Sequence, residues 1–138
     1  ELCSRAQAVT FLWRAAGCPE PESDVCPFAD VSADSVYYNA ILWAWENGVT
    51  VGADSTHFDP DGSCTRAQIV TFLYRFAGSP SVRVRCPFID VSLRSPYYSA
   101  IAWAYSKGIA LGTDALRFSP DDFCTRSHIV TFLYRYMA

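Results

Sequence analysis

Hydrophobic positions along the chain recur with a helical period, in two kinds of pattern. One kind covers residues 36–47. The apolar residues at the spacing i, i+3, i+4 and i+7 are Tyr38, Ile41, Leu42 and Trp45. This spacing places them on one face of an amphipathic helix, and residues 96–107 repeat it. Gly48 and Gly108 supply the left-handed residue that often ends such a helix. The pattern predicts two short helices of one kind.

A second helical pattern begins near residues 4, 65 and 125. Its apolar stripe after residue 65 consists of Ile69, Phe72, Leu73 and Phe76. T-R-A-Q at 65–68 is a capping box, in which the Thr hydroxyl accepts from the third helical N–H and the Gln side chain reaches back. S-R-A-Q at 4–7 repeats the box. In T-R-S-H at 125–128, His128 replaces Gln, which predicts a weaker reciprocal bond.

The chain is built from a repeat of about 60 residues. Residues 26–78 align without a gap with residues 86–138, and more than half of the positions are identical. The opening stretch aligns in turn with residues 63–78. The sequence therefore divides into a partial unit over 1–17, which is the last helix of a repeat, and two full units over 26–79 and 86–138.

Neither kind of helix can bury its apolar stripe within one unit. The units must therefore pack on one another, in a closed bundle or a short solenoid. Loops rich in Gly, Asp and Pro at 52–61 and 112–121 connect the helices. We expect an all-α fold with ordered loops and one or two bonded residue pairs between extended segments near Phe28 and Phe88.

Composition and charge narrow the class of protein. The formal net charge of −3 argues against a scaffold that neutralises nucleic-acid phosphates. No apolar run reaches the roughly 18 residues that a bilayer span requires. The first five residues have neither the basic start nor the apolar stretch of a signal peptide. We interpret them as the interior of a larger protein or the start of a cut mature chain.

Six cysteines in 138 residues favour an oxidising, extracellular setting. Pairing within units gives Cys26–Cys64 and Cys86–Cys124, and we prefer this scheme because both full units are then bridged. If each cysteine before a long helix is instead paired with a cysteine of the following unit, the bridges are Cys3–Cys26 and Cys64–Cys86. Buried free thiols that act as small hydrophobic groups are the remaining alternative.

An ordered set of motifs covers nearly the whole chain. It runs F-x-D-V, Y-Y-x-x-A-I-x-W-A, G-[IV]-x-x-G, F-x-P-D and T-R-[AS]-[QH]. The set closely resembles the S-layer homology domain. The resemblance implies helical repeats in a pseudo-threefold bundle with grooves between neighbours. It also implies attachment of surface proteins to secondary cell-wall polysaccharide, which often carries a pyruvate ketal.

The basic residue of the last motif falls on Arg5, Arg66 and Arg126, in the first turn of each helix of the second kind. A cation there opposes the helix dipole. Together with exposed helix N–H groups, however, it makes an anion pocket. We therefore expect these arginines to hold a carboxylate-bearing sugar. The alternative is that each arginine pairs with Asp30 or Asp90 and only ties the units together.

Six further residues are candidates for contacts with the glycan: Asp30, Asp90, Trp43, Trp103, Gly52 and Gly112. The aspartates could orient the arginines or accept from sugar hydroxyls, or they could only form caps and turns. The tryptophans could stack on sugar rings, although one aromatic residue per helix is also typical of a core. The glycines allow a tight turn first and a close approach of the ligand second.

Catalysis, metals and cofactors are not expected. No carboxylate pair suggests a glycosidase, and no G-x-S-x-G, H-E-x-x-H or P-loop motif occurs. No cysteine and histidine spacing indicates zinc, and the loop at 52–61 lacks the spacing of a calcium loop.

We predict a non-catalytic module of the bacterial cell surface that anchors a larger protein to secondary cell-wall polysaccharide. We expect neither nucleic-acid binding nor membrane insertion. A structural protein–protein assembly module of a surface layer is the alternative function, and homo-oligomerisation is compatible with both.

Overall fold

The computed structural model describes residues 1–138 and contains five helices and no sheet. The prediction of an all-α fold is therefore confirmed. The helices are α1 (Arg5–Ala15), α2 (Tyr38–Glu46), α3 (Arg66–Phe76), α4 (Tyr98–Ser106) and α5 (Arg126–Met137). None of them is long and apolar enough to cross a bilayer.

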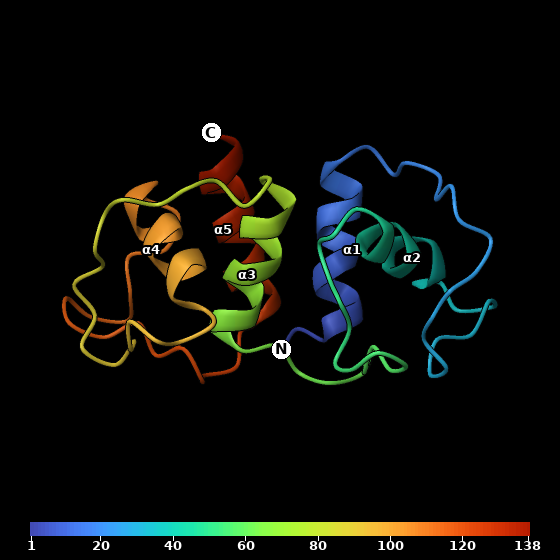
Figure 1. Cartoon of the computed structure of the whole chain (residues 1–138), viewed down its shortest axis with the longest axis horizontal. Coiled ribbons are helices and arrows are strands. Elements are labelled where there is room, and N and C mark those ends of the chain that lie inside the picture. Colours follow the sequence, from blue (N-terminus) through green and yellow to red (C-terminus); the bar gives the residue numbers. More distant parts are fainter.

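The molecule is elongated, with two helix pairs at opposite ends of its long axis (Figure 1). Helix α2 packs on α1 at one end, and α4 packs on α3 at the other, beside α5. Both short helices end as predicted, because Gly48 and Gly108 follow them with φ values of +73° and +70°. The long linkers that lead from α1 to α2 and from α3 to α4 run around the outside of each end.

Three backbone segments meet where α1, α3 and α5 begin, and we call this meeting point the hub. The amide of Cys3 donates to the carbonyl of Cys124, that of Cys124 to Cys64, and that of Cys64 back to Cys3, at 2.8–2.9 Å. The result is a closed ring of three hydrogen bonds with pseudo-threefold symmetry. All three cysteine side chains are fully buried. The units therefore close on one another rather than stack as an open solenoid.

The same hub supplies partners for the first amides of the helices. The amide of Arg5 donates to Gly62, that of Arg66 to Asp122 and that of Arg126 to Glu1. All three capping boxes are complete. The reciprocal bond to His128 measures 3.2 Å, against 2.9 Å for the bonds to Gln7 and Gln68, which agrees with the weaker box expected there.

One backbone hydrogen bond joins the loops near each of Phe28 and Phe88, as expected: the amide of Ala29 donates to Thr56 at 2.7 Å, and that of Ile89 to Leu116 at 2.8 Å. The isolated β-bridges lie elsewhere, at the hub, in the pairs 2 with 125, 4 with 63 and 65 with 123.

All six cysteines are free thiols, so the predicted bridges Cys26–Cys64 and Cys86–Cys124 are not formed in the structure. The reason is that Cys64 and Cys124 are enclosed in the ring with Cys3. Their proposed partners lie in the outer linkers and are partly exposed.

Helix α5 differs from α1 and α3 because no short helix packs on it. Val130 of α5 is 50% exposed, whereas its counterparts Val9 and Val70 are fully buried. The repeat thus places the same side chain in two environments, which provides a matched pair for measuring burial.

Val70→Ala should lower the free energy of unfolding by about 1.5–3 kcal/mol, because it removes buried methyl groups and leaves a cavity. Val130→Ala should cost less than about 0.5 kcal/mol, as expected for an exposed site. Urea unfolding followed by circular dichroism measures both. Equal losses would contradict the difference in burial between α3 and α5.

The hub thiols should resist alkylation, because burial raises the pKa of Cys3 to about 11, of Cys64 to about 12 and of Cys124 to about 11. The thiolate is the reactive form. At pH 8, iodoacetamide should therefore modify the exposed Cys18 quickly and the hub thiols only after denaturation, as measured by peptide mass spectrometry. A bridge would show as two thiols that stay unreactive in denaturant until a reductant is added.

Candidate functional site

A polar groove of about 400 Å³ lies between α1, the loop that leads into α3, and α3 itself. Its floor and walls include Arg5, Gly52, Asp59, Gln68, Thr71, Arg75 and Tyr97. Tyr97 comes from the segment just before α4, so the groove collects residues from all three units. It holds two cations and one carboxylate, and is therefore locally positive within an acidic chain.

Arg5 is held in a fixed position at this groove. Its side chain is buried, and its Nε donates to the carbonyl of Phe58 at 2.8 Å. The Cζ atom lies 4.9 Å from the ring centroid of Phe58 and 5.5 Å from that of Phe72. The guanidinium is thus stacked between two aromatic rings. Its terminal nitrogens make no hydrogen bond within the protein and remain available to a ligand in the groove.

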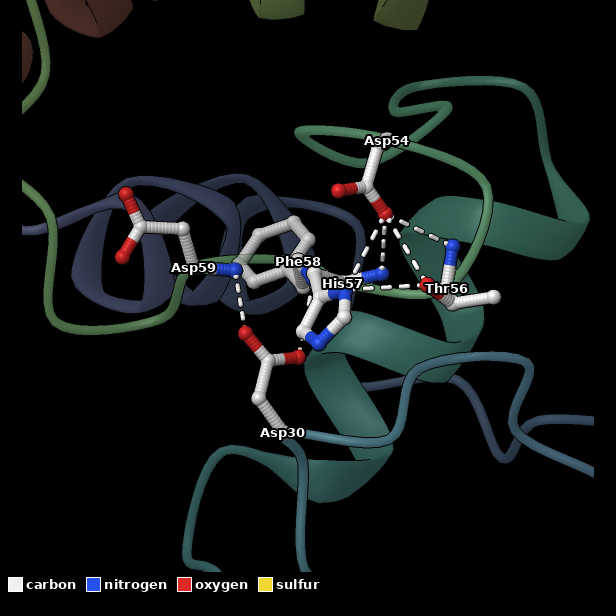
Figure 2. Close-up of polar contacts among 6 residues, drawn as sticks. All are labelled: Asp30, Asp54, Thr56, His57, Phe58 and Asp59. Carbon is white, nitrogen blue, oxygen red and sulfur yellow. Dashed lines mark hydrogen bonds and ion pairs between the residues drawn. The ribbon is translucent and has the colours of Figure 1, made fainter.

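Asp30 also fixes the backbone of this turn, and Figure 2 shows its carboxylate against Phe58 and Asp59. Its carboxylate accepts from the amides of Phe58 at 2.9 Å and Asp59 at 2.8 Å. Desolvation acts to raise the pKa of Asp30, but the two amide donors outweigh it and hold the pKa below its ordinary value. No ion pair joins Arg5 to Asp30, so the alternative in which these two residues pair directly is not seen, and both instead contact the backbone of Phe58.

The neighbouring turn is ordered by Asp54. Its carboxylate accepts from the amides of Thr56 and His57, and the imidazole of His57 lies 3.2 Å away (Figure 2). The hydrogen bond from Thr56 is the main reason that the pKa of Asp54 is lowered. This loop is a rigid support for Phe58 and Asp59.

The second full unit repeats this construction. Arg66 donates from Nε to Phe118 at 2.8 Å and is stacked between Phe118 and Phe132. Desolvation lowers the pKa of its guanidinium. Asp90 accepts from the amides of Phe118 and Ser119. No residue takes the place of Tyr97 beside Arg66, and no pocket forms there.

Arg126 occupies a third and different setting. It is exposed, and its guanidinium pairs with the carboxylate of Glu1. With Gln7, Thr10, Arg14 and Tyr37 it lines a pocket of about 230 Å³. These residues correspond to those of the larger groove, but the loop wall is absent. The structure therefore contains one walled groove and one partial groove.

Free helix amides do not contribute to the groove as the sequence had suggested. The amides of Arg5 and Ala6 already donate to the carbonyls of Gly62 and Pro60, at 2.8 and 3.0 Å. The third amide of α1, on Gln7, donates to the hydroxyl of Ser4. Any anion in the groove must therefore be held by side chains.

Trp43 and Trp103 are placed in the core, not in the groove. Both indoles are buried, and Trp103 packs against Tyr74 and Tyr136 at 5.6 and 5.8 Å between ring centroids. Neither residue lines the groove, but Trp43 borders a pocket of about 260 Å³ and Trp103 one of about 420 Å³ elsewhere on the molecule. Sugar stacking on these two rings stays a prediction.

Gly52 and Gly112 have the role that was expected first, in a tight turn. Both have a φ of +91°, where side chains are strained. A Cβ atom at Gly52 would also collide with the ring of Phe28. Gly52 lines the groove as well, whereas Gly112 borders no pocket.

Five of the groove residues named above were missed as candidates: Asp59, Gln68, Thr71, Arg75 and Tyr97. Thr71 and Arg75 recur at the same positions of every long helix, beside the apolar stripe, whereas the Gln recurs in α1 and is replaced by His128 in α5. The oxygen of Gln68 is used by its capping box, so its amide group can only donate to a ligand. Thr71 donates to Ala67, which leaves its oxygen free to accept from a hydroxyl. The groove thus offers mostly donors, as an acidic, hydroxyl-rich ligand requires.

The arrangement suits binding rather than bond cleavage. Asp59 is the groove's single carboxylate, whereas glycoside hydrolysis ordinarily uses two. No group of three or more His, Cys, Asp or Glu side chains is placed to hold a metal ion. The fold and the groove therefore define a helical repeat module with a locally positive groove.

Comparison with known proteins identifies the family. Residues 27–70 and 87–129 match the S-layer homology domain. Over 116 residues the chain is 34% identical to a surface-layer 125 kDa protein of Lysinibacillus sphaericus, covering 81% of this chain and 9% of that protein. It is 32% identical over 116 residues to an endoglucanase of Bacillus sp. (strain KSM-635), covering 84% and 12%. It is 28% identical over 114 residues to a cell surface protein of Thermoanaerobacter kivui, covering 79% and 15%.

The chain belongs to the S-layer homology domain family, a non-catalytic anchoring module of cell-surface proteins. It spans between 9% and 15% of the length of these relatives. The hydrolytic activity in the name of the endoglucanase is therefore a property of that protein and is not carried over.

Asp30→Asn should lower the free energy of unfolding at pH 7 by about 1 kcal/mol, because the amide keeps one acceptor oxygen and loses the charge. Because folding lowers the pKa of Asp30, its contribution is present above the unfolded pKa of about 3.9 and disappears as the pH falls through the folded value. Acidification below about pH 4 should therefore lower the free energy of unfolding less in the variant than in the native protein.

Urea titrations between pH 7 and pH 2.5 measure this difference. Asp34→Asn is the matched control, since the Asp34 carboxylate accepts no hydrogen bond. Identical pH profiles for Asp30→Asn and the native protein would contradict the role of Asp30 in holding the turn.

Proposed function

We propose that the groove between α1 and α3 binds an acidic residue of secondary cell-wall polysaccharide, and that this binding anchors the protein to the bacterial cell wall. The observation that supports it best is Arg5, buried and stacked between Phe58 and Phe72, with its terminal nitrogens unused. A buried guanidinium with free donors favours a planar carboxylate, which it can bind through two parallel hydrogen bonds.

The other groove residues fit a sugar that carries this carboxylate. The side chain of Arg75, on α3, makes no hydrogen bond within the protein and supplies a second cation to the groove. Gln68 can donate to sugar oxygens, and Thr71 and Asp59 can accept from hydroxyls. Tyr97 offers a partly exposed ring and a hydroxyl. A pyruvate ketal combines a carboxylate with a sugar ring and matches these groups.

The chain's relatives support the location but not the ligand. Two of them are surface proteins by name. Arg5 is the arginine of the three that lines the walled groove. We therefore assign the proposed site to Arg5.

The experiment compares binding to purified wall polysaccharide before and after chemical removal of pyruvate. Arg75→Ala should weaken binding about 10-fold or more, because a charged hydrogen bond contributes about 1.5–3 kcal/mol. Arg5→Lys should also weaken binding, because lysine keeps the charge but loses the fork of donors. Arg83→Ala is the matched control, since Arg83 is exposed in a linker outside the groove. Isothermal titration calorimetry measures the affinity.

Circular dichroism must show that each variant is folded. Native affinity in both Arg75→Ala and Arg5→Lys would refute the proposed site. Affinity that does not change when pyruvate is removed would exclude the ketal as the group that is recognised.

A further inference from the structure

The two ends of the molecule carry opposite net charge. Residues 1–62 contain ten acidic and two basic side chains, a formal charge of −8. Residues 63–138 contain four acidic and nine basic side chains, a formal charge of +5. These halves correspond to the α1–α2 end and the α3–α4–α5 end of the long axis (Figure 1). Such a separation orients approaching molecules and favours contact between unlike ends.

The positive end carries an exposed apolar surface, which we call the α4 tip. It consists of Ile89, Leu93, Arg94, Leu116 and Arg117. Ile89, Leu93 and Leu116 are 67%, 63% and 53% exposed. Two loops form the tip, and they are tied together because the amide of Ile89 donates to the carbonyl of Leu116 at 2.8 Å.

The first full unit has the same backbone but a different surface. There the equivalent amide, on Ala29, donates to Thr56 at 2.7 Å. The five tip positions are occupied by Ala29, Ala33, Asp34, Thr56 and His57. At three of these positions the second full unit has Ile or Leu where the first has Ala or Thr. At the other two it has Arg where the first has Asp or His. The fold accepts either set, so the apolar and basic surface of the second full unit is not needed for folding.

We propose that the α4 tip is an interaction surface that docks on the acidic α2 end of a second copy of this chain. The α2 end offers the complementary chemistry. Val25 and Val36 are 71% and 84% exposed there, and the exposed Asp24 and Asp34 lie one and two positions before them in the sequence. The tip brings leucine and isoleucine side chains flanked by Arg94 and Arg117.

The contact joins two different surfaces at opposite ends of the molecule. Such a heterologous contact leaves a free tip and a free α2 end on every pair, so copies add in an open chain. The guanidinium of Arg117 lies 3.8 Å from the carboxylate of Asp114, which partly offsets its positive charge. The guanidinium of Arg94 makes no ion pair. Arg94 is therefore the main charged group of the tip. Neither surface includes a residue of the groove, so this proposal is independent of glycan binding.

Analytical ultracentrifugation tests the proposal. In about 0.1 M salt the average mass of the native chain should rise above 15.3 kDa with concentration. It should fall back in about 1 M salt, because the Debye length shortens from about 10 Å to about 3 Å. A mass that stays at 15.3 kDa up to millimolar concentration overturns the proposal.

Two variants locate the contact. The tip variant, Leu93→Ala with Arg94→Asp and Leu116→Thr, takes the residues of the first full unit, which the same backbone already carries. The α2-end variant is Asp24→Arg with Asp34→Arg, whose carboxylates make no hydrogen bond in the native structure. Each variant alone should associate at least 10-fold more weakly than the native chain. Lys107→Ala, outside the tip, is the matched control and should associate normally.

Mixing the two variants provides the decisive measurement. One retains an intact α2 end and the other an intact tip, so an equimolar mixture should recover association that neither shows alone. Failure of the mixture to associate, or normal association of either variant alone, overturns the proposal. Vesicles containing phosphatidylglycerol test the other partner class. Binding of the native chain to them through the tip, without self-association, would also overturn it.

Circular dichroism serves as the folding control for both variants, and their spectra should match that of the native chain. No substituted residue lines the groove, so these variants leave the proposed glycan site intact. Loss of association with a native spectrum therefore concerns the docking contact, whereas loss of glycan binding in Arg75→Ala concerns the groove.

Discussion

The ring of backbone hydrogen bonds among Cys3, Cys64 and Cys124 is the constraint on which the rest of the structure depends. These residues lie 60 or 61 positions apart in sequence, and one ring brings them together. Each then leads directly into a capped helix, so the ring also sets where α1, α3 and α5 begin. Small side chains are needed there, because all three are fully enclosed. Cysteine meets this need as a small hydrophobic residue, without a bridge.

The groove follows from the same arrangement. The loop that supplies carbonyls to the first amides of α1 also brings Phe58 and Asp59 against Arg5. Asp30 and Arg5 then hold the backbone of Phe58 from two sides, one by accepting and one by donating. The arginine is fixed without its terminal nitrogens being used. Helix capping is thus separate from the proposed ligand binding: backbone carbonyls accept from the first amides of the helix, and the terminal nitrogens of Arg5 remain unused.

The repeat gives the chain three helices that begin with the same capped turn and carry an arginine at the same position. The surroundings of this arginine differ among the three copies. Arg5 lines a walled groove, no pocket forms at Arg66, and Arg126 pairs with the carboxylate of Glu1. Identical motifs therefore lie in different surroundings. The surfaces of the two full units have also diverged, because exposed residues at the ends do not affect the hub or the core. A single fold can in this way carry an acidic end, a basic and apolar end, and a cationic groove between them.

The sequence by itself determined the local structure. Helical periods, capping boxes and the glycines after the short helices depend on residues within a few positions of each other, and these predictions were confirmed for all five helices. The repeat and its motifs also determined the family and pointed to Arg5 and Asp30. Capping and periodicity are short-range effects, which is why one sequence suffices to read them.

Tertiary structure alone decided what the long-range contacts do. It placed Trp43 and Trp103 in the core and enclosed Cys64 and Cys124 in the hub. It also occupied the helix amides that had been expected to bind the anion. The groove brings Arg5, Arg75 and Tyr97 together from segments up to 92 residues apart, and no local pattern encodes that distance. Closure of the ring determines which faces meet, and therefore which polar residues are left free to bind.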